Sequence, residues 1–176
     1  MHIDIELPLT AEKIANLRAG DTVKLSGVIY TAHDAAHKRL VAALDAGEEL
    51  PVELRDQTIY FAGPCPAPPG RPIGSAGPTT SGRMDAYSPR LIRECQLRGM
   101  IGKGERSESV QKAMQECGAI YFAATGGAGA LIARSIVAAE VVAFPDLGPE
   151  AIRKLTVKDF PVIVAIDDKG GNLYNR

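Results

Sequence analysis

Residues 22–47 read TVKLSGVIYTAHDAAHKRLVAALDAG, a strand pattern followed directly by a helix pattern. The first part has apolar residues in a pattern typical of a strand, and Gly27 within it predicts a β-bulge. The second part predicts a helix that Asp34 caps at its start and that stops at Gly47. The segment therefore forms one strand–helix unit with polar residues at the junction.

The same order of strand and helix recurs along the chain. We expect further strands at 4–7, 58–62, 100–101, 119–123, 141–144 and 161–166, and helices at 10–17, 88–99, 107–117 and 128–138. A short helix is expected to open near Pro149, and residues 167–171 predict a hairpin turn. This alternation predicts an α/β fold with a mixed central sheet flanked by helices, in which ligands meet the loops at strand ends.

Composition limits the classes of partner. The 176 residues include 45% hydrophobic residues, enough for one core, so we expect a single domain over residues 1–176. A net charge of −1 and an aromatic content of 5% argue against a nucleic-acid partner. The acidic N-terminus and the lack of any 18-residue apolar stretch predict a cytoplasmic protein with no membrane partner.

The three cysteines give no metal signature. Cys65, Cys95 and Cys117 are widely spaced and form no CxxC pair. This pattern predicts neither a disulfide framework nor a zinc or iron–sulfur site within this chain.

The junction TAHDAAHKR, residues 31–39, is the first of four loops that could carry chemistry. His33 and His37 are four residues apart with an acid between them, which imitates the HExxH spacing of zinc hydrolases. Aspartate is shorter than the usual glutamate, and His2 is the only other histidine in the chain. We therefore favour polar groups that bind no metal over a zinc site.

The next two loops each place a positive charge beside glycine. GPTTSGRMD, residues 77–85, combines the Thr79 and Thr80 hydroxyls with Arg83 and predicts an oxyanion site. The alternative is a polar surface turn in which Arg83 pairs with Asp85 or with another surface acid. In GKG, residues 102–104, the flanking glycines leave room for the Lys103 ammonium to meet a ligand at close range.

The fourth loop, TGGAGA at residues 125–130, separates an apolar strand from a helix. An anion there would face the helix N-terminus. A dinucleotide site is an alternative, with Asp146 roughly where the ribose-binding acid would lie, but Ile132 occupies the position of the third glycine.

These motifs, taken in order with the run from TGGAGALIA to DDKGGNLY, resemble the β subunit of class I fumarate hydratase. The module is also similar to the C-terminal domain of single-chain class I fumarases and to the β subunit of L-tartrate dehydratase. The resemblance implies a swivelling β/α domain in a hetero-oligomer with an α subunit, whose three cysteines hold an oxygen-sensitive [4Fe–4S] cluster. It implies a hydro-lyase that interconverts fumarate and L-malate, with no cofactor bound by this chain alone.

The resemblance also implies residue roles. Thr79 and Lys103 are expected to be catalytic, Thr79 in proton transfer and Lys103 as the charge that stabilises the developing aci-carboxylate. Substrate binding is expected from Arg83, His33, Thr80 and Gly102, with Asp34, His37 and Asp85 in support.

One position departs from this family. Arginine is usual where this chain has His33, in TARDAAHKR or TGRDAAHKR, and histidine is shorter and only partly charged at neutral pH. The hydroxydiacid substrate is therefore open between the fumarase and tartrate dehydratase reactions. A binding module of this fold that has lost catalysis is the remaining alternative.

Overall fold

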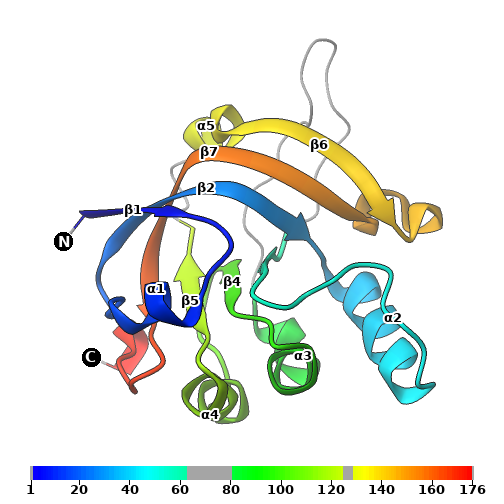
Figure 1. The fold of residues 1–176 in the computed structure, drawn as a ribbon, viewed down its shortest axis with the longest axis horizontal. Coiled ribbons are helices and arrows are strands. Elements are labelled where there is room, and N and C mark those ends of the chain that lie inside the picture. Colours follow the sequence, from blue (N-terminus) through cyan, green and yellow to red (C-terminus); the bar gives the residue numbers. More distant parts are fainter. Residues whose placement is uncertain (1, 63–80, 125–128, 176) are drawn as a thin grey trace.

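The computed structural model describes residues 2–62, 81–124 and 129–175 (Figure 1). Its strands are β1 His2–Glu6, β2 Thr22–Thr31, β3 Thr58–Tyr60, β4 Gly99–Gly102, β5 Ile120–Ala123, β6 Ile136–Ala143 and β7 Ile152–Ile166. Its α-helices are α1 Ala11–Ala15, α2 Asp34–Asp45, α3 Ser88–Cys95, α4 Glu108–Cys117 and α5 Gly129–Ser135. The 3-10 helices are η1 Ser81–Ala86, η3 Pro145–Glu150 and η4 Leu173–Asn175.

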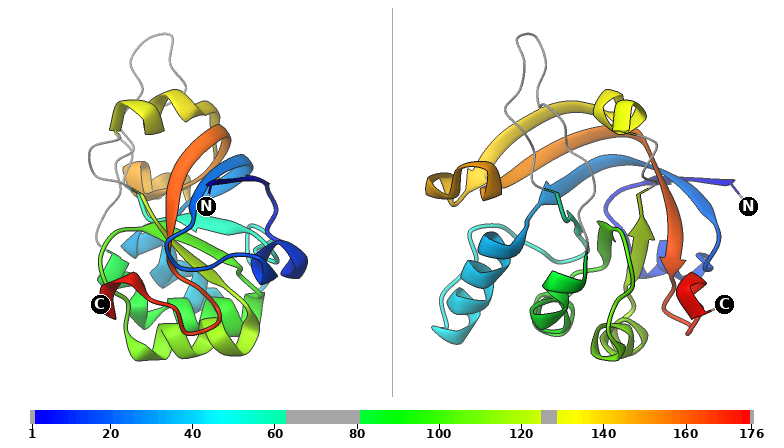
Figure 2. Two further views of the ribbon diagram at one scale, coloured as in Figure 1. Left: turned by 90° about the vertical axis from the view of Figure 1, so that its left-hand side faces the viewer. Right: turned by 180° about the vertical axis from the view of Figure 1, so that it is seen from behind.

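The strands form one mixed sheet that closes on itself. β2, β3, β4 and β5 pair in parallel, β5 pairs antiparallel with β7, and β7 returns to pair antiparallel with β2. β1 pairs in parallel with the first half of β2, and β6 pairs antiparallel with the first part of β7. The long strands β2, β7 and β6 arch over the molecule, while α2, α3 and α4 lie on the opposite side (Figures 1 and 2). The expected α/β fold is confirmed, and its form is consistent with the swivelling domain that the resemblance implies.

Both faces of the ring are buried, which produces two cores. Side chains that point into the ring form the inner core, which includes Leu25, Tyr60, Ile101, Phe122 and Phe160. The alternate strand residues, among them Ile59 and Met100, face the helices and form the outer core with helix residues such as Leu40 of α2 and Val110 of α4. The alternation of Ile59, Tyr60 and Phe61 between the two cores follows from the two-residue period of a strand.

Several local signals in the sequence are confirmed. Thr10 caps α1 by accepting from the Lys13 backbone N–H, and Ser107 caps α4 in the same way. Gly27 has φ +128° at a register shift between β2 and β7, as a bulge requires.

Two helix ends differ from the expectation. The N-cap of α2 is His33 rather than Asp34, and its side chain makes no capping hydrogen bond. α3 ends with Gln96 in the left-handed conformation, whereas Gly99 already belongs to β4. A short connection to a buried strand leaves no room for the helix to continue to the glycine.

The C-terminal third contains more strand than expected. The expected helix at 128–138 ends at Ser135, and strand β6 begins at once. The expected helix near Pro149 is the 3-10 turn η3, and β7 starts at Ile152 rather than at residue 161. β7 is hydrogen-bonded on both sides, by β2 and by β6, over this missed half, and such distant pairing overrides local helix patterns.

Within the described parts of the chain, no helix has both the length and the apolar character needed to cross a lipid bilayer.

The inner core supplies a test of the fold. Leu25 is fully buried inside the ring, whereas Leu131 on α5 is 56% exposed. We expect Leu25→Ala to lower the free energy of unfolding by about 2–5 kcal/mol, because it leaves a cavity. Leu131→Ala, the matched control, is expected to cost less than about 0.5 kcal/mol. Denaturant unfolding measures both, and equal effects would contradict the two-sided burial of the ring.

Candidate functional site

Three of the predicted loops meet at the carboxyl ends of parallel strands. His33 follows β2, η1 lies in the connection after β3, and Lys103 follows β4. The Arg83 Nη2 atom lies 3.3 Å from Asp34 Oδ2, which joins the first loop to the second. The Ser81 backbone N–H donates to the Lys103 carbonyl at 2.9 Å, which joins the second to the third. Motifs far apart in the sequence therefore form one site at the carboxyl ends of the parallel strands, where ligands of both open and closed α/β sheets usually bind.

Arg83 points into solvent from this site. Its side chain is 70% exposed, and Asp34 also accepts a hydrogen bond from the Tyr87 hydroxyl at 3.3 Å. Burial, followed by the Asp34 carboxylate, raises the pKa of Tyr87, so its hydroxyl stays protonated as a donor. An exposed ion pair is weak, so the guanidinium can turn its remaining donors to an anion. Arg83 thus pairs with another acid, Asp34, as one form of the alternative expected, and not with Asp85, which binds Arg106 at 2.6 Å.

Lys103 is exposed, and no described residue forms a hydrogen bond or an ion pair with its ammonium group. Gly102 beside it is buried, and a Cβ atom there would overlap Ser81 Oγ and lie 3.0 Å from Phe61 Cδ2. The lack of a side chain at Gly102 thus lets the end of β4 pack against Ser81, which brings Lys103 close to η1.

His33 has a partner that the sequence did not indicate. Its Nδ1 atom lies 3.3 Å from Glu150 Oε1, and the same oxygen accepts from the Ala35 backbone N–H at 3.2 Å. Glu150, from η3, thereby supplies the N-terminal cap of α2 that His33 itself does not. The contact spans 117 residues, so no local pattern could have revealed it.

η3 is fixed to α2 by a second carboxylate. Arg39 binds both carboxylate oxygens of Asp146, at 2.9 and 2.5 Å, and its guanidinium lies over the Phe144 ring. The Arg39 hydrogen bonds hold the pKa of Asp146 below its usual range. Because Asp146 is already paired with Arg39, the structure does not favour the alternative in which Asp146 binds the ribose of a dinucleotide.

His37 lies beneath the first loop. Its ring is fully buried against Phe61 and Tyr87, and burial lowers its pKa to about 4. The imidazole is therefore neutral near pH 7, and Nδ1–H donates to the His33 carbonyl at 2.7 Å. Its buried Nε2 atom has no hydrogen-bond partner among the residues that the structure describes. The buried His37 ring thus holds the backbone of the first loop in place at His33.

The described residues do not form a metal site. No group of three histidine, cysteine, aspartate or glutamate side chains within them could hold an ion. Cys95 and Cys117 are free, and Cys65 lies outside the described residues. These donors fit neither the zinc alternative nor a [4Fe–4S] cluster.

Two predicted site residues, Thr79 and Thr80, lie outside the described residues, as do residues 125–128 of the glycine loop. Their roles stay predictions.

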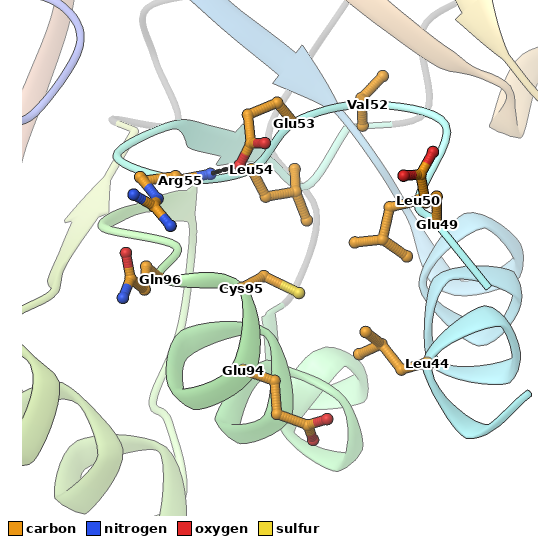
Figure 3. A pocket seen from close by; sticks show the side chains of 10 residues that line it. All are labelled: Leu44, Glu49, Leu50, Val52, Glu53, Leu54, Arg55, Glu94, Cys95 and Gln96. Atoms are coloured by element: carbon orange, nitrogen blue, oxygen red, sulfur yellow. Dashed lines mark hydrogen bonds between the residues drawn. The ribbon is translucent and has the colours of Figure 1, made fainter. Parts of the chain in front are cut away.

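A cavity of about 470 Å³ lies away from the three loops, between the end of α2, the end of α3 and residues 49–55 (Figure 3). Its lining includes Leu44, Leu54 and Cys95 but no residue of the predicted motifs. Burial raises the pKa of the Cys95 thiol, which disfavours the reactive thiolate.

Comparison with known proteins places this geometry in context. The sequence model of a family described as "Fumarase C-terminus" matches residues 1–176. The chain is 39% identical to "Fumarate hydratase class I, anaerobic" of Escherichia coli and 36% identical to "Fumarate hydratase 2" of Leishmania major, in each case over 99% of its length. It spans only 32% and 31% of those two relatives. It is also 39% identical, over 96% of its length, to a Methanocaldococcus jannaschii protein named "Putative L(+)-tartrate dehydratase subunit beta", and there it covers 89% of the relative.

The close approach at Gly102 gives a test of the site's packing. We expect Gly102→Ala to lower the free energy of unfolding by about 1–3 kcal/mol, because the new methyl group must displace Ser81 or Phe61. Gly82→Ala is the control, since a Cβ atom there meets nothing within 4 Å. Denaturant midpoints compare the two variants, and an unaffected Gly102→Ala would contradict the packing of β4 against η1.

His37 gives a test of pH dependence. Because its pKa falls from 6.5 to about 4 on folding, the unfolded chain binds the proton more readily between these values. Stability therefore falls as pH falls, and this group alone should remove about 2 kcal/mol between pH 7 and pH 5. His37→Gln should flatten that part of the stability profile, whereas His2→Gln, at an exposed position, should not. Identical profiles for the two variants would show that His37 is not buried as a neutral ring.

Proposed function

This chain belongs to the fumarase C-terminus family, and from that premise we propose that it is the β subunit of an iron–sulfur hydro-lyase. The most favoured reaction is the interconversion of fumarate and L-malate, at a site shared with an α subunit. The observation that carries the proposal is the convergence of Arg83 and Lys103, from separate loops, beside the His33 loop. The chain spans about a third of the length of its fumarate hydratase relatives.

The charges of the described loops support a site completed by a partner. Arg83 and Lys103 bring positive charge, but the Asp34 carboxylate contacts Arg83 and the Glu150 carboxylate contacts His33. These charges nearly balance, whereas a dicarboxylate brings two negative charges. Further positive charge or N–H donors are therefore required, and the partner is the proposed source of the charge.

Each proposed role follows from side-chain chemistry. Arg83 binds one substrate carboxylate through the donors that Asp34 leaves free, because a guanidinium fits a carboxylate with two parallel hydrogen bonds. Lys103, whose ammonium is unpaired among the described residues, stabilises the charge that develops on a carboxylate when the neighbouring carbon loses its proton. Thr79 remains the proposed proton-transfer residue, on the resemblance alone, with Thr80 as a further binding group.

The [4Fe–4S] cluster belongs to the partner in this proposal. The described residues offer no suitable set of donors for it, and the sequence has no cysteine motif that would hold it.

The second candidate is the β subunit of an L-tartrate dehydratase. The chain covers 89% of a relative with that name, so the two are similar in extent as well as in sequence. The substitution of His33 for the arginine of the resemblance, together with its Glu150 partner, supports a difference in substrate at this corner of the site.

Activity of the assembled complex tests the proposal. The chain is co-expressed with a candidate cluster-bearing chain and reconstituted anaerobically with iron and sulfide, and turnover of malate, fumarate and tartrate is followed. We expect activity only with both chains. Lys103→Ala should lower kcat/KM by at least about 100-fold, because a preorganised charge at the reacting carboxylate is lost.

Lys158→Ala is the matched control, since it removes the same charge from an exposed position on β7. Its kcat/KM should stay within about twofold of the wild type. Activity of the isolated chain would contradict the shared site. A stable complex with an intact cluster but no activity on any of the three substrates would favour the non-catalytic binding module.

A further inference from the structure

A buried arginine lies beneath the proposed site. Arg106 is only 4% exposed, and its guanidinium is sandwiched between the rings of Phe61 and Tyr121, 5.1 and 4.9 Å from their centroids. Its Nε atom donates to Asp85 Oδ1 at 2.6 Å and its Nη2 atom donates to Ser88 Oγ at 2.7 Å. A buried charge is tolerated only when such partners are in place, so the positions of Arg106, Asp85 and Ser88 are tightly coupled.

These partners join the two loops that carry the substrate-binding cations. Asp85 lies two residues after Arg83, and Arg106 lies three residues after Lys103. The second carboxylate oxygen of Asp85 accepts from the Ser107 backbone N–H at 2.7 Å. Asp85 is thus bonded on both oxygens to the segment that follows Lys103.

Tyr121 provides a second link between the same loops. Its hydroxyl donates to the Gly104 carbonyl at 2.9 Å and accepts from Ser81 Oγ, 2.7 Å away. Burial raises the pKa of this phenol, so the donor proton is retained. Ser81 lies two residues before Arg83, and Gly104 directly follows Lys103.

We propose that Arg106 and Tyr121 are positioning residues that fix the separation of Arg83 and Lys103, and thereby the length of the dicarboxylate that the site accepts. This inference rests on the proposed function, because it takes both cations as carboxylate ligands. On either side of Arg83, Ser81 bonds to Tyr121 and Asp85 bonds to Arg106. Directly after Lys103, the Gly104 carbonyl also accepts from Tyr121. The backbone positions of both cations are therefore set, and only their side chains remain free to adjust.

Fixed separation predicts discrimination between substrates that differ by one methylene group. With the backbone of both cations fixed, their side chains reach a limited range of separations. A site that takes a four-carbon diacid, as proposed above, should therefore bind a five-carbon diacid less tightly, and one methylene is typically worth about 10–200-fold in such a site. Loosening either link lets the loops adapt to the longer diacid, so discrimination falls before binding is lost.

Calorimetric titration with succinate and glutarate tests this proposal, because it needs no turnover. The full chain is titrated in complex with its partner, as wild type, Tyr121→Phe and Arg106→Lys. Tyr121→Phe removes one hydroxyl and keeps the ring, and Arg106→Lys keeps the charge but cannot bond Asp85 and Ser88 in the same geometry. We expect the ratio of succinate to glutarate affinity to fall by roughly tenfold in each variant. Tyr174→Phe, on η4, is the control and should leave the ratio unchanged.

Hydrogen exchange on the same proteins reports the link itself. The Ser81 N–H, bonded to the Lys103 carbonyl, should exchange faster in Tyr121→Phe, while amides in β2 keep their protection. Unchanged exchange at Ser81 would overturn the link between the loops. Faster exchange with an unchanged affinity ratio would show a merely structural role and would equally overturn the proposal.

The two proposals can fail separately. A wild-type complex that prefers succinate to glutarate and loses this preference in both variants supports the positioning role, even if it converts neither malate nor tartrate. That result would reject the hydro-lyase function alone. A wild-type complex that does not discriminate between the two diacids would reject the positioning role, whatever its activity.

Discussion

The antiparallel pairing of β2 with β7 is the constraint on which the rest of the structure depends. It runs from Thr22 opposite Ile163 to Thr31 opposite Arg153, and it closes the ring that buries the inner core. The same register explains a contact in the site. Because Thr31 lies opposite Arg153, the residues just beyond them, His33 and Glu150, are brought together although they are 117 residues apart in sequence. One set of backbone hydrogen bonds thus fixes both the core and one corner of the site.

Sequence reasoning predicted the elements whose signals are local. The strand–bulge–helix unit at 22–47, the capped helix after Ser107 and the meeting of the Arg83 and Lys103 loops all follow from residues that are neighbours in sequence or from the order of parallel strands. The first part of β6 and the first half of β7 were missed because their strand conformation depends on distant partners. Glu150, Arg106 and Tyr121 were missed for the same reason, since each gains its meaning from a contact made only after the ring has closed.

The two main cations of the site are stabilised in different ways. Arg83 shares Asp34 with Tyr87 at the surface, so it can exchange one carboxylate for another at little cost. Lys103 has no such partner among the described residues, and its position depends on the packing of Gly102 against Ser81 and Phe61. A charge left unpaired in the free chain has no internal ion pair to break when a ligand arrives, which favours binding.

A buried charge at Arg106 is not the most stable way to fill the space between two aromatic rings. An apolar side chain could occupy that space without the cost of removing a guanidinium from water, and such replacements often stabilise proteins. It would not bond Asp85 and Ser88, however, and apolar contacts fix distance without fixing direction. The charged and hydroxyl groups beneath the loops restrict where Arg83 and Lys103 can lie. This restriction is what a site requires when it must hold two carboxylates a fixed distance apart.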